Sequence, residues 1–274
     1  MDIFIKAVER AAKERRSGSA GYSEETGLVV VPGLRRVKSL QEIEYTETPV
    51  ERLCVPAAHP VNTYTRNGEL APSVHAYNIL RTRILQRLER NGWNLLALTS
   101  PARGNGKTTT AVNLAISIAR STTHSALLVD LDLRRPSIHG HFGFDPAQGV
   151  TDLVCGRGTF QQVAFNPGIQ RLTVLPGREK VAHSSEFLSS SNMQQFVQDV
   201  RERYPKRIVI FDMPPVLGGA DVLSFLPSVQ ACLLVLEAGR TTRDELREAT
   251  KALQQSTVIG TVLNRGVVEK GATY

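Results

Sequence analysis

Residues 99–110 have the composition of a loop that binds phosphate. Gly104 and Gly106 precede Lys107 and Thr108 in the sequence GNGKT. Glycines allow the backbone N–H groups of such a loop to turn toward phosphate oxygens, and the N-terminus of a following helix adds partial positive charge. The lysine ammonium can reach the β- and γ-phosphates, and the threonine hydroxyl can ligate Mg²⁺. The segment therefore predicts a nucleotide-binding loop of the P-loop type.

The sequence around this loop supports the interpretation, with one departure. An apolar, strand-like run precedes the loop and an amphipathic stretch follows it, which is the context that the motif requires. The strict pattern begins with glycine six residues before the lysine, where this chain has Pro101. The predicted nucleotide-binding residues of the loop are Arg103, Gly104, Asn105, Gly106, Lys107, Thr108 and Thr109.

Two downstream segments carry aspartates at the ends of apolar runs. The sequence ALLVDLDLRRP contains Asp130 and Asp132, and the single residue between them places both carboxylates on one side of an extended chain. The sequence RIVIFDMPPV contains Asp212 directly after an apolar run. Carboxylates beside bound phosphates suit Mg²⁺ coordination and a general base for an attacking hydroxyl. We therefore predict that Lys107 and the three aspartates are catalytic residues.

These residues need a scaffold that brings separate segments to one edge. Strand-like runs and helix-like stretches alternate from residue 74 onward. Several runs are almost continuously apolar, as expected for parallel strands with helices on both faces, and ligands of such sheets bind at the carboxyl ends of the strands. The predicted fold is an α/β P-loop NTPase with a mostly parallel sheet covered by helices on both faces. The predicted strands lie at 94–99, 126–131, 171–175, 207–212, 231–236 and 257–263, and the predicted helices at 74–90, 107–120, 186–203 and 241–255.

The composition divides the chain into four parts. Residues 1–16 have apolar side chains at helical spacing and predict an amphipathic helix. Residues 17–73 contain many Gly, Ser, Thr and Pro residues and predict a linker or a loosely ordered arm. Residues 74–268 form the predicted nucleotide-binding domain, and residues 269–274 form a tail that ends in Tyr274.

Composition and charge argue against several other classes of protein. The chain has 33 Lys and Arg residues against 26 Asp and Glu residues, a formal charge of +7, but no block of five like charges and no basic-aromatic motif. We therefore expect no nucleic-acid partner. The three cysteines form no CxxC pair, which argues against a zinc site or a disulfide framework. No secretory signal and no apolar run of about 18 residues is evident, so we expect a cytoplasmic protein.

A stripe of arginines marks one side of the predicted helix 74–90. Arg83, Arg87 and Arg90 follow one another at i, i+4 and i+7, opposite the apolar side. Such a stripe is most often a solvated face, and an acidic or phosphorylated partner is the alternative.

With these motifs in this order, residues 74–265 resemble the bacterial tyrosine kinases of polysaccharide export, in particular the autokinases of exosortase-linked exopolysaccharide loci. The similarity extends over TSPARGNGKTTTAVNLA, LLVDLDLRRPS, RYPKRIVIFDMPPVL and VIGTVLN. The resemblance implies a kinase domain with ATP and Mg²⁺ as ligands. It places Lys107 and Thr108 on phosphate and metal, and Asp130 and Asp212 on the metal side.

The resemblance also implies further site residues and a mode of regulation. Asp132 becomes the base toward a tyrosine hydroxyl, Arg134 a supporting residue, and Asn264 a residue near the adenine. In the family, a neighbouring subunit of a ring phosphorylates tail tyrosines, and a membrane chain-length regulator activates the kinase. For this chain the resemblance implies a protein tyrosine autokinase at the inner face of the cell membrane, a possible homo-oligomer, and Tyr274 as the phosphoacceptor candidate.

Departures from the family pattern leave a second function open. The ring-forming pattern Glu-x2-Arg-x2-Arg is represented by His75, Asn78 and Arg81, and the tail has a single tyrosine. The alternative is a regulatory P-loop ATPase or nucleotide-switched module that signals to a membrane polysaccharide chain-length regulator without tyrosine phosphorylation. Related partition and septum-site ATPases carry a signature lysine where this chain has Ala102, which argues against that branch.

Overall fold

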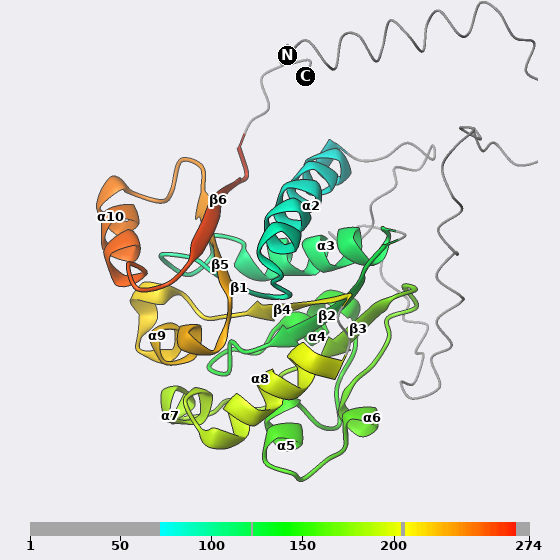
Figure 1. Cartoon of the computed structure of the whole chain (residues 1–274). Coiled ribbons are helices and arrows are strands. Elements are labelled where there is room, and N and C mark those ends of the chain that lie inside the picture. Colours follow the sequence, from blue (N-terminus) through cyan, green and yellow to red (C-terminus); the bar gives the residue numbers. More distant parts are fainter. Residues whose placement is uncertain (1–71, 122, 204–205, 267–274) are drawn as a thin grey trace, which may run out of the picture. The chain divides into compact units, whose positions relative to one another are not determined.

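The described part of the chain contains a six-stranded sheet. The computed structural model describes residues 72–121, 123–203 and 206–266. Every neighbouring pair of strands is parallel, and the strand order is β3-β2-β4-β1-β5-β6 (Figure 1). The strands are β1 (Leu95–Thr99), β2 (Ser125–Asp130), β3 (Leu172–Leu175), β4 (Arg207–Asp212), β5 (Ala231–Glu237) and β6 (Val258–Asn264).

Helices cover both faces of this sheet. Helices α2 and α3 lie together on one face, and α8 with several short helices covers the other (Figure 1). The α-helices are α2 (Pro72–Asn91), α3 (Lys107–Ala119), α4 (Ile138–Phe142), α5 (Val150–Val154), α6 (Phe160–Val163), α7 (Ser184–Leu188), α8 (Ser191–Arg203), α9 (Asp221–Phe225) and α10 (Arg243–Ala252). Two 3₁₀ turns, η1 (Val216–Gly218) and η2 (Leu226–Ser228), flank α9.

Alternating strand side chains divide the hydrophobic core into two layers. Leu95 and Ala97 of β1 pack in the layer that contains Phe196 of α8. Leu96 and Leu98 pack in the other layer, with α2 and α3. Because successive side chains of a strand point to opposite faces, a strand covered on both sides must be apolar at every position. Each fully buried leucine contributes about 1.5–3 kcal/mol to folding.

The strand order brings the predicted site residues together. Strand β4 lies between β2 and β1. Asp130 of β2 and Asp212 of β4 are paired in register, and Leu98 of β1 also pairs with Asp212. Since parallel strands end at the same edge, the loop after β1 and both aspartates meet at the carboxyl edge of the sheet.

The predicted fold class is confirmed, and all six strands are parallel. One predicted helix, 186–203, is instead two helices, α7 and α8. The break lies at Ser189 and Ser190, where the Ser190 hydroxyl accepts the N–H of Met193 at 3.3 Å and so caps α8.

Several predicted segments lie outside the described residues. These are the helix at 1–16, the arm up to residue 71 and the tail with Tyr274. Helix α2 begins at Pro72, two residues before the predicted start of the domain. Among the described helices, none combines the length and apolar character that a membrane span needs.

Candidate active site

The P-loop connects the end of β1 to the start of α3. Gly104 and Gly106 have left-handed φ angles of +83° and +85°, which favour glycine. Helix α3 begins at Lys107, with Gly106 at its N-cap. Glycine has no side chain that could accept hydrogen bonds from the first N–H groups of α3, so these groups remain available to an anion. The loop thus has the backbone geometry that phosphate binding requires.

Lys107 lies between two carboxylates. Its Nζ is 2.7 Å from Oδ2 of Asp132 and 3.5 Å from Oδ1 of Asp212. Burial lowers the pKa of Lys107, but the charges of Asp212 and Asp132 outweigh this effect and raise the pKa above its usual value. The lysine therefore stays protonated and holds the side chains of two predicted site residues together.

The Asp130 carboxylate is fully buried and bound by backbone groups. Its Oδ2 accepts the N–H groups of Ser137 at 2.9 Å and Ile138 at 3.0 Å, and its Oδ1 accepts that of Asp132 at 3.3 Å. Burial, followed by the charge of Asp212, raises the pKa of Asp130 to about 7. This side chain therefore fixes the turn that carries Asp132. Its assignment as a metal ligand stays a prediction.

Asp212 supplies a carboxylate with free coordination capacity. Both oxygens are buried and accept no hydrogen bond of ordinary geometry, although the Thr108 hydroxyl and the Lys107 ammonium lie nearby. Burial raises the pKa of Asp212. A buried carboxylate without donors is unfavourable, and a divalent cation would relieve this cost. The residues present therefore fit Mg²⁺, which Asp212 and Thr108 would hold. No group of three or more acidic, His or Cys side chains among the described residues could hold a metal alone.

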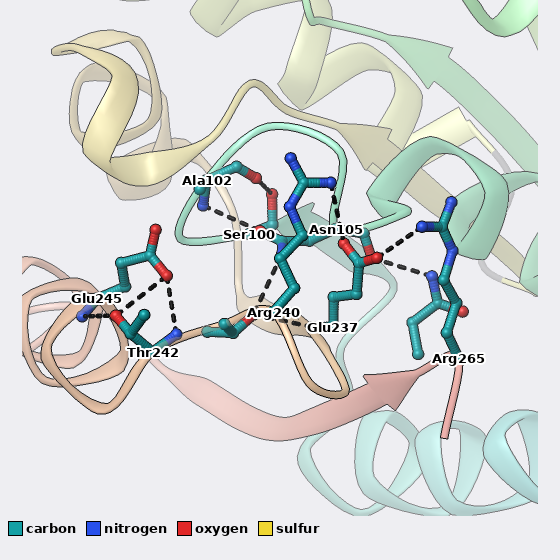
Figure 2. A network of polar contacts seen from close by, with 10 residues as sticks. Ser100, Ala102, Asn105, Glu237, Arg240, Thr242, Glu245 and Arg265 are labelled. Carbon is teal, nitrogen blue, oxygen red and sulfur yellow. Dashed lines mark hydrogen bonds and ion pairs between the residues drawn. The ribbon is translucent and has the colours of Figure 1, made fainter. Parts of the chain in front are cut away.

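Asn105 ties the P-loop to the ends of β5 and β6. Its side-chain oxygen accepts the N–H of Ala102 at 3.0 Å, and its amide donates to the Thr241 hydroxyl at 3.1 Å (Figure 2). The side-chain amide of Asn264 donates to the backbone carbonyl of Asn105 at 3.0 Å. A Cβ atom at Gly106 would lie 2.0 Å from Nδ2 of Asn264. Asn264 therefore contacts the P-loop backbone, and its contact with adenine stays a prediction.

Glu237 joins two arginines beside the loop. Its Oε1 accepts a hydrogen bond from Nη1 of Arg265 at 2.5 Å, and its Oε2 accepts one from Nη1 of Arg240 at 3.4 Å (Figure 2). The Arg240 guanidinium lies over the P-loop, since a Cβ atom at Gly104 would be 2.6 Å from its Nη1. Arg240, in the loop after β5, therefore adds positive charge to the outer side of the P-loop.

Arg134 is held in place by a buried carboxylate. Its Nε and Nη2 donate to Oδ2 and Oδ1 of Asp221 at 2.9 and 2.7 Å, and the Ser184 hydroxyl donates to Oδ2 at 2.6 Å. Such bidentate pairs fix the plane of the guanidinium. Because Arg134 follows Asp132 by two residues, this contact also fixes the loop that carries Asp132.

The structure brings the four predicted catalytic residues together, and it places the other predicted residues around them. Arg103 is exposed in the loop, and Thr109 lies half-buried in the first turn of α3. At the position of the ring-forming motif, Arg81 donates to Oδ1 of Asn78 at 3.2 Å and to the carbonyl of Ser117 at 2.9 Å. Arg81 thus connects α2 to α3 by hydrogen bonds within the chain.

Four residues at the site were not found by sequence reasoning: Ser184, Asp221, Glu237 and Arg265. No motif marks the first two, because their partners are distant in the sequence. Glu237 carried a usable signal, since it is an acidic residue at the carboxyl end of an apolar strand, as Asp212 is.

Fold and site together define a P-loop NTPase domain: a glycine-containing loop after a central strand, Lys and Thr at the helix start, and aspartates on adjacent parallel strands. A family model described as an AAA domain matches residues 95–250, more than half of the chain. The chain therefore belongs to this family and, within it, to the bacterial tyrosine kinases, as the relatives below show.

Three known proteins illustrate the relationship. The solved kinase domain of VpsO is 31% identical with a TM-score of 0.64, and the match covers 71% of this chain and 95% of that one. Tyrosine-protein kinase YwqD of Bacillus subtilis is 29% identical over 200 residues, which cover 72% of this chain and 83% of YwqD. EpsB of Ralstonia solanacearum is 34% identical over 193 residues, 68% of this chain. The chain spans only about a quarter of the length of EpsB, since the match covers 24% of it.

Proposed function

We propose that this chain is an ATP-dependent protein tyrosine autokinase that regulates exopolysaccharide or capsule biosynthesis and export. The observation that carries the proposal is the convergence of Lys107, Asp132 and Asp212 at the end of the P-loop, where the buried Asp212 oxygens accept no hydrogen bond of ordinary geometry. The similarity to the kinase domain of VpsO and to the tyrosine-protein kinase YwqD supports tyrosine as the acceptor.

The chemistry assigns a task to each side chain. Lys107 and the backbone N–H groups of the P-loop bind phosphate oxygens and neutralise their charge. Asp132 takes the proton from a tyrosine hydroxyl. The tyrosine oxygen bonds to the γ-phosphorus, and the bond between the γ-phosphorus and the bridging oxygen breaks, so that this oxygen leaves with ADP. Lys107 pairs with Asp132 at 2.7 Å, so a lysine that turned toward the phosphates would leave the Asp132 carboxylate free to accept the proton.

Metal binding and recruitment complete the proposal. Asp212 and Thr108 would hold Mg²⁺, with Asp130 beside them, and the ion supplies charge neutralisation at the phosphates when bound. We place the kinase in the cytoplasm, at the inner face of the cell membrane, with a membrane polysaccharide chain-length regulator as activating partner. The family resemblance of the motifs supports this placement.

A regulatory ATPase or nucleotide switch without tyrosine phosphorylation is the second candidate. The contacts of Arg81 with Asn78 and Ser117 favour this second candidate. Arg81 occupies a position of the ring-forming motif, and its donors are already bonded to groups of the same chain.

Phosphosite mass spectrometry after incubation with Mg–ATP separates the two candidates. The autokinase gives phosphotyrosine in the wild type and none in Lys107→Met, with Tyr274 as the first position to inspect. Phosphate release without phosphotyrosine, in a preparation that binds ATP, would select the ATPase and reject the kinase. Asp132→Asn provides a second variant, since it removes the base and keeps Lys107 and the glycines of the P-loop.

A further inference from the structure

A groove lined by arginines lies between α2 and the last strands of the sheet. Its volume is about 400 Å³. Arg83, Arg87 and Arg90 line it from α2, and Ile259 and Thr261 line it from β6. The groove lies away from the P-loop, and none of the predicted site residues lines it.

The arginines of the groove lack acidic partners. All three are exposed, and no acidic residue lines the groove. Arg87 donates to the carbonyl of Ile259, whereas Arg83 and Arg90 have no hydrogen bond or ion pair with any part of the chain that the structure describes. Like charges one helical turn apart destabilise a helix. An anionic occupant would relieve this repulsion.

The floor of the groove is apolar. Leu80 and Ile84 of α2 line it on one side, and Leu233 of β5 and Ile259 of β6 line it on the other. An occupant that fits must therefore carry acidic groups toward the arginines and apolar groups toward this floor. A free inorganic anion satisfies only the first requirement, so the groove favours a peptide segment.

We propose that residues 42–51 of this same chain dock in the groove. The segment reads EIEYTETPVE and has four glutamates and no basic residue. In an extended peptide alternate side chains point to opposite sides. Glu42 and Glu44 would then face the arginines, and Ile43 and Tyr45 would face the apolar floor.

The connection to α2 has the length that this docking needs. Residues 52–71 form a connection of 20 residues between the acidic segment and the start of α2 at Pro72. A flexible chain of that length has a mean end-to-end distance of about 25 Å. Arg87 lies 15 residues into α2, about 22 Å along its axis at 1.5 Å per residue. The segment therefore reaches the groove without strain, at an effective concentration on the order of millimolar.

Hydrogen exchange of the full chain tests this docking. At low salt and without nucleotide, backbone amides of residues 42–51 exchange more slowly than in a variant with all four glutamates changed to lysine. At an effective concentration of about 1 mM, a Kd of about 0.5 mM for the segment gives about threefold slower exchange. At 1 M salt, where the screening length falls to about 3 Å, the difference disappears.

Charge reversal in the groove supplies the specific test. Changing Arg83, Arg87 and Arg90 to Glu removes the protection, and combining this change with the four Glu→Lys substitutions restores it. The control is Arg247→Glu on α10, an exposed arginine outside the groove, which leaves the protection unchanged. Changing the three arginines to Gln gives the same loss with less disturbance, and exchange of the β1 amides verifies the fold.

Three results would overturn the proposal. One is exchange of residues 42–51 at the same rate in the wild type and in the Glu→Lys variant. Another is protection that persists when the arginines are changed, because the segment would then bind elsewhere. The third is protection that rises with protein concentration, because a second copy or another protein would then be the occupant.

Discussion

Gly106→Ala probes the contact between the P-loop and β6. The residue has a φ of +85°, and an alanine Cβ would stand 2.0 Å from Nδ2 of Asn264. The Asn264 side chain must then turn away and give up its hydrogen bond to the carbonyl of Asn105. The substitution therefore acts twice, through its own backbone strain and through a displaced neighbour.

The structure gives the size of each effect. A non-glycine residue in the left-handed region costs about 1–2 kcal/mol, and a lost hydrogen bond costs about 1 kcal/mol. Gly106→Ala should therefore lower the free energy of unfolding by about 2–3 kcal/mol. Asn264→Ala alone should cost about 1 kcal/mol, but almost nothing once Gly106→Ala is present, because the hydrogen bond is already broken.

Urea unfolding of the nucleotide-free protein measures this double-mutant cycle, with a coupling of about 1 kcal/mol expected. Gly92→Ala is the matched control. Gly92 has a φ of +65°, and a Cβ atom there would meet nothing within 4 Å. Its effect should simply add to that of Asn264→Ala. Additive effects at Gly106 as well would refute the reasoning, because they would show that the two side chains do not compete for one space.

Three further predictions concern single side chains. The Asp130 carboxyl has a pKa of about 7 in the folded state against 3.8 for a free aspartate, so the folded state binds more protons. The free energy of unfolding should therefore fall by up to about 4 kcal/mol as the pH rises from 4 to 7 and then level off. Thermal unfolding at a series of pH values should show a smaller dependence of the midpoint on pH for Asp130→Asn. Asp221→Asn should lower the free energy of unfolding by about 1–3 kcal/mol, measured by urea unfolding, and an unchanged midpoint would mean that solvent replaces the Arg134 pair. Thr242→Ala should cost about 1 kcal/mol and accelerate hydrogen exchange in α10, because the hydroxyl accepts the N–H of Glu245 at 3.2 Å; Thr242→Asp should restore both values.

Local sequence patterns were sufficient to predict the sheet and the edge at which the candidate site lies. Strand β4 occupies the predicted range 207–212, because a continuous apolar run ending in Asp212 fits only a strand covered on both faces. The P-loop was predictable because its chemistry depends on neighbours in the sequence. Lys107 and Asp212 could be placed at one edge because parallel strands share it.

Long-range polar contacts could not be predicted in the same way. The pairing of Lys107 with Asp132 depends on side-chain geometry at the end of two elements. The clamp of Asp221 on Arg134 joins residues 87 positions apart. The break between α7 and α8 depends on a serine hydroxyl that competes with the helix for one N–H group. Hydrophobic periodicity carries no information on any of these contacts.

The two edges of the sheet differ in how well they are closed. At β3, Phe165 forms an antiparallel bridge with Val174. At β6, where Leu263 is 64% exposed, the Arg87 side chain contacts the Ile259 carbonyl. Open strand edges recruit strands from other chains, and long charged side chains deter this. Arg87 thus places a charged side chain at the β6 edge, where it disfavours pairing with the edge strand of a neighbouring copy.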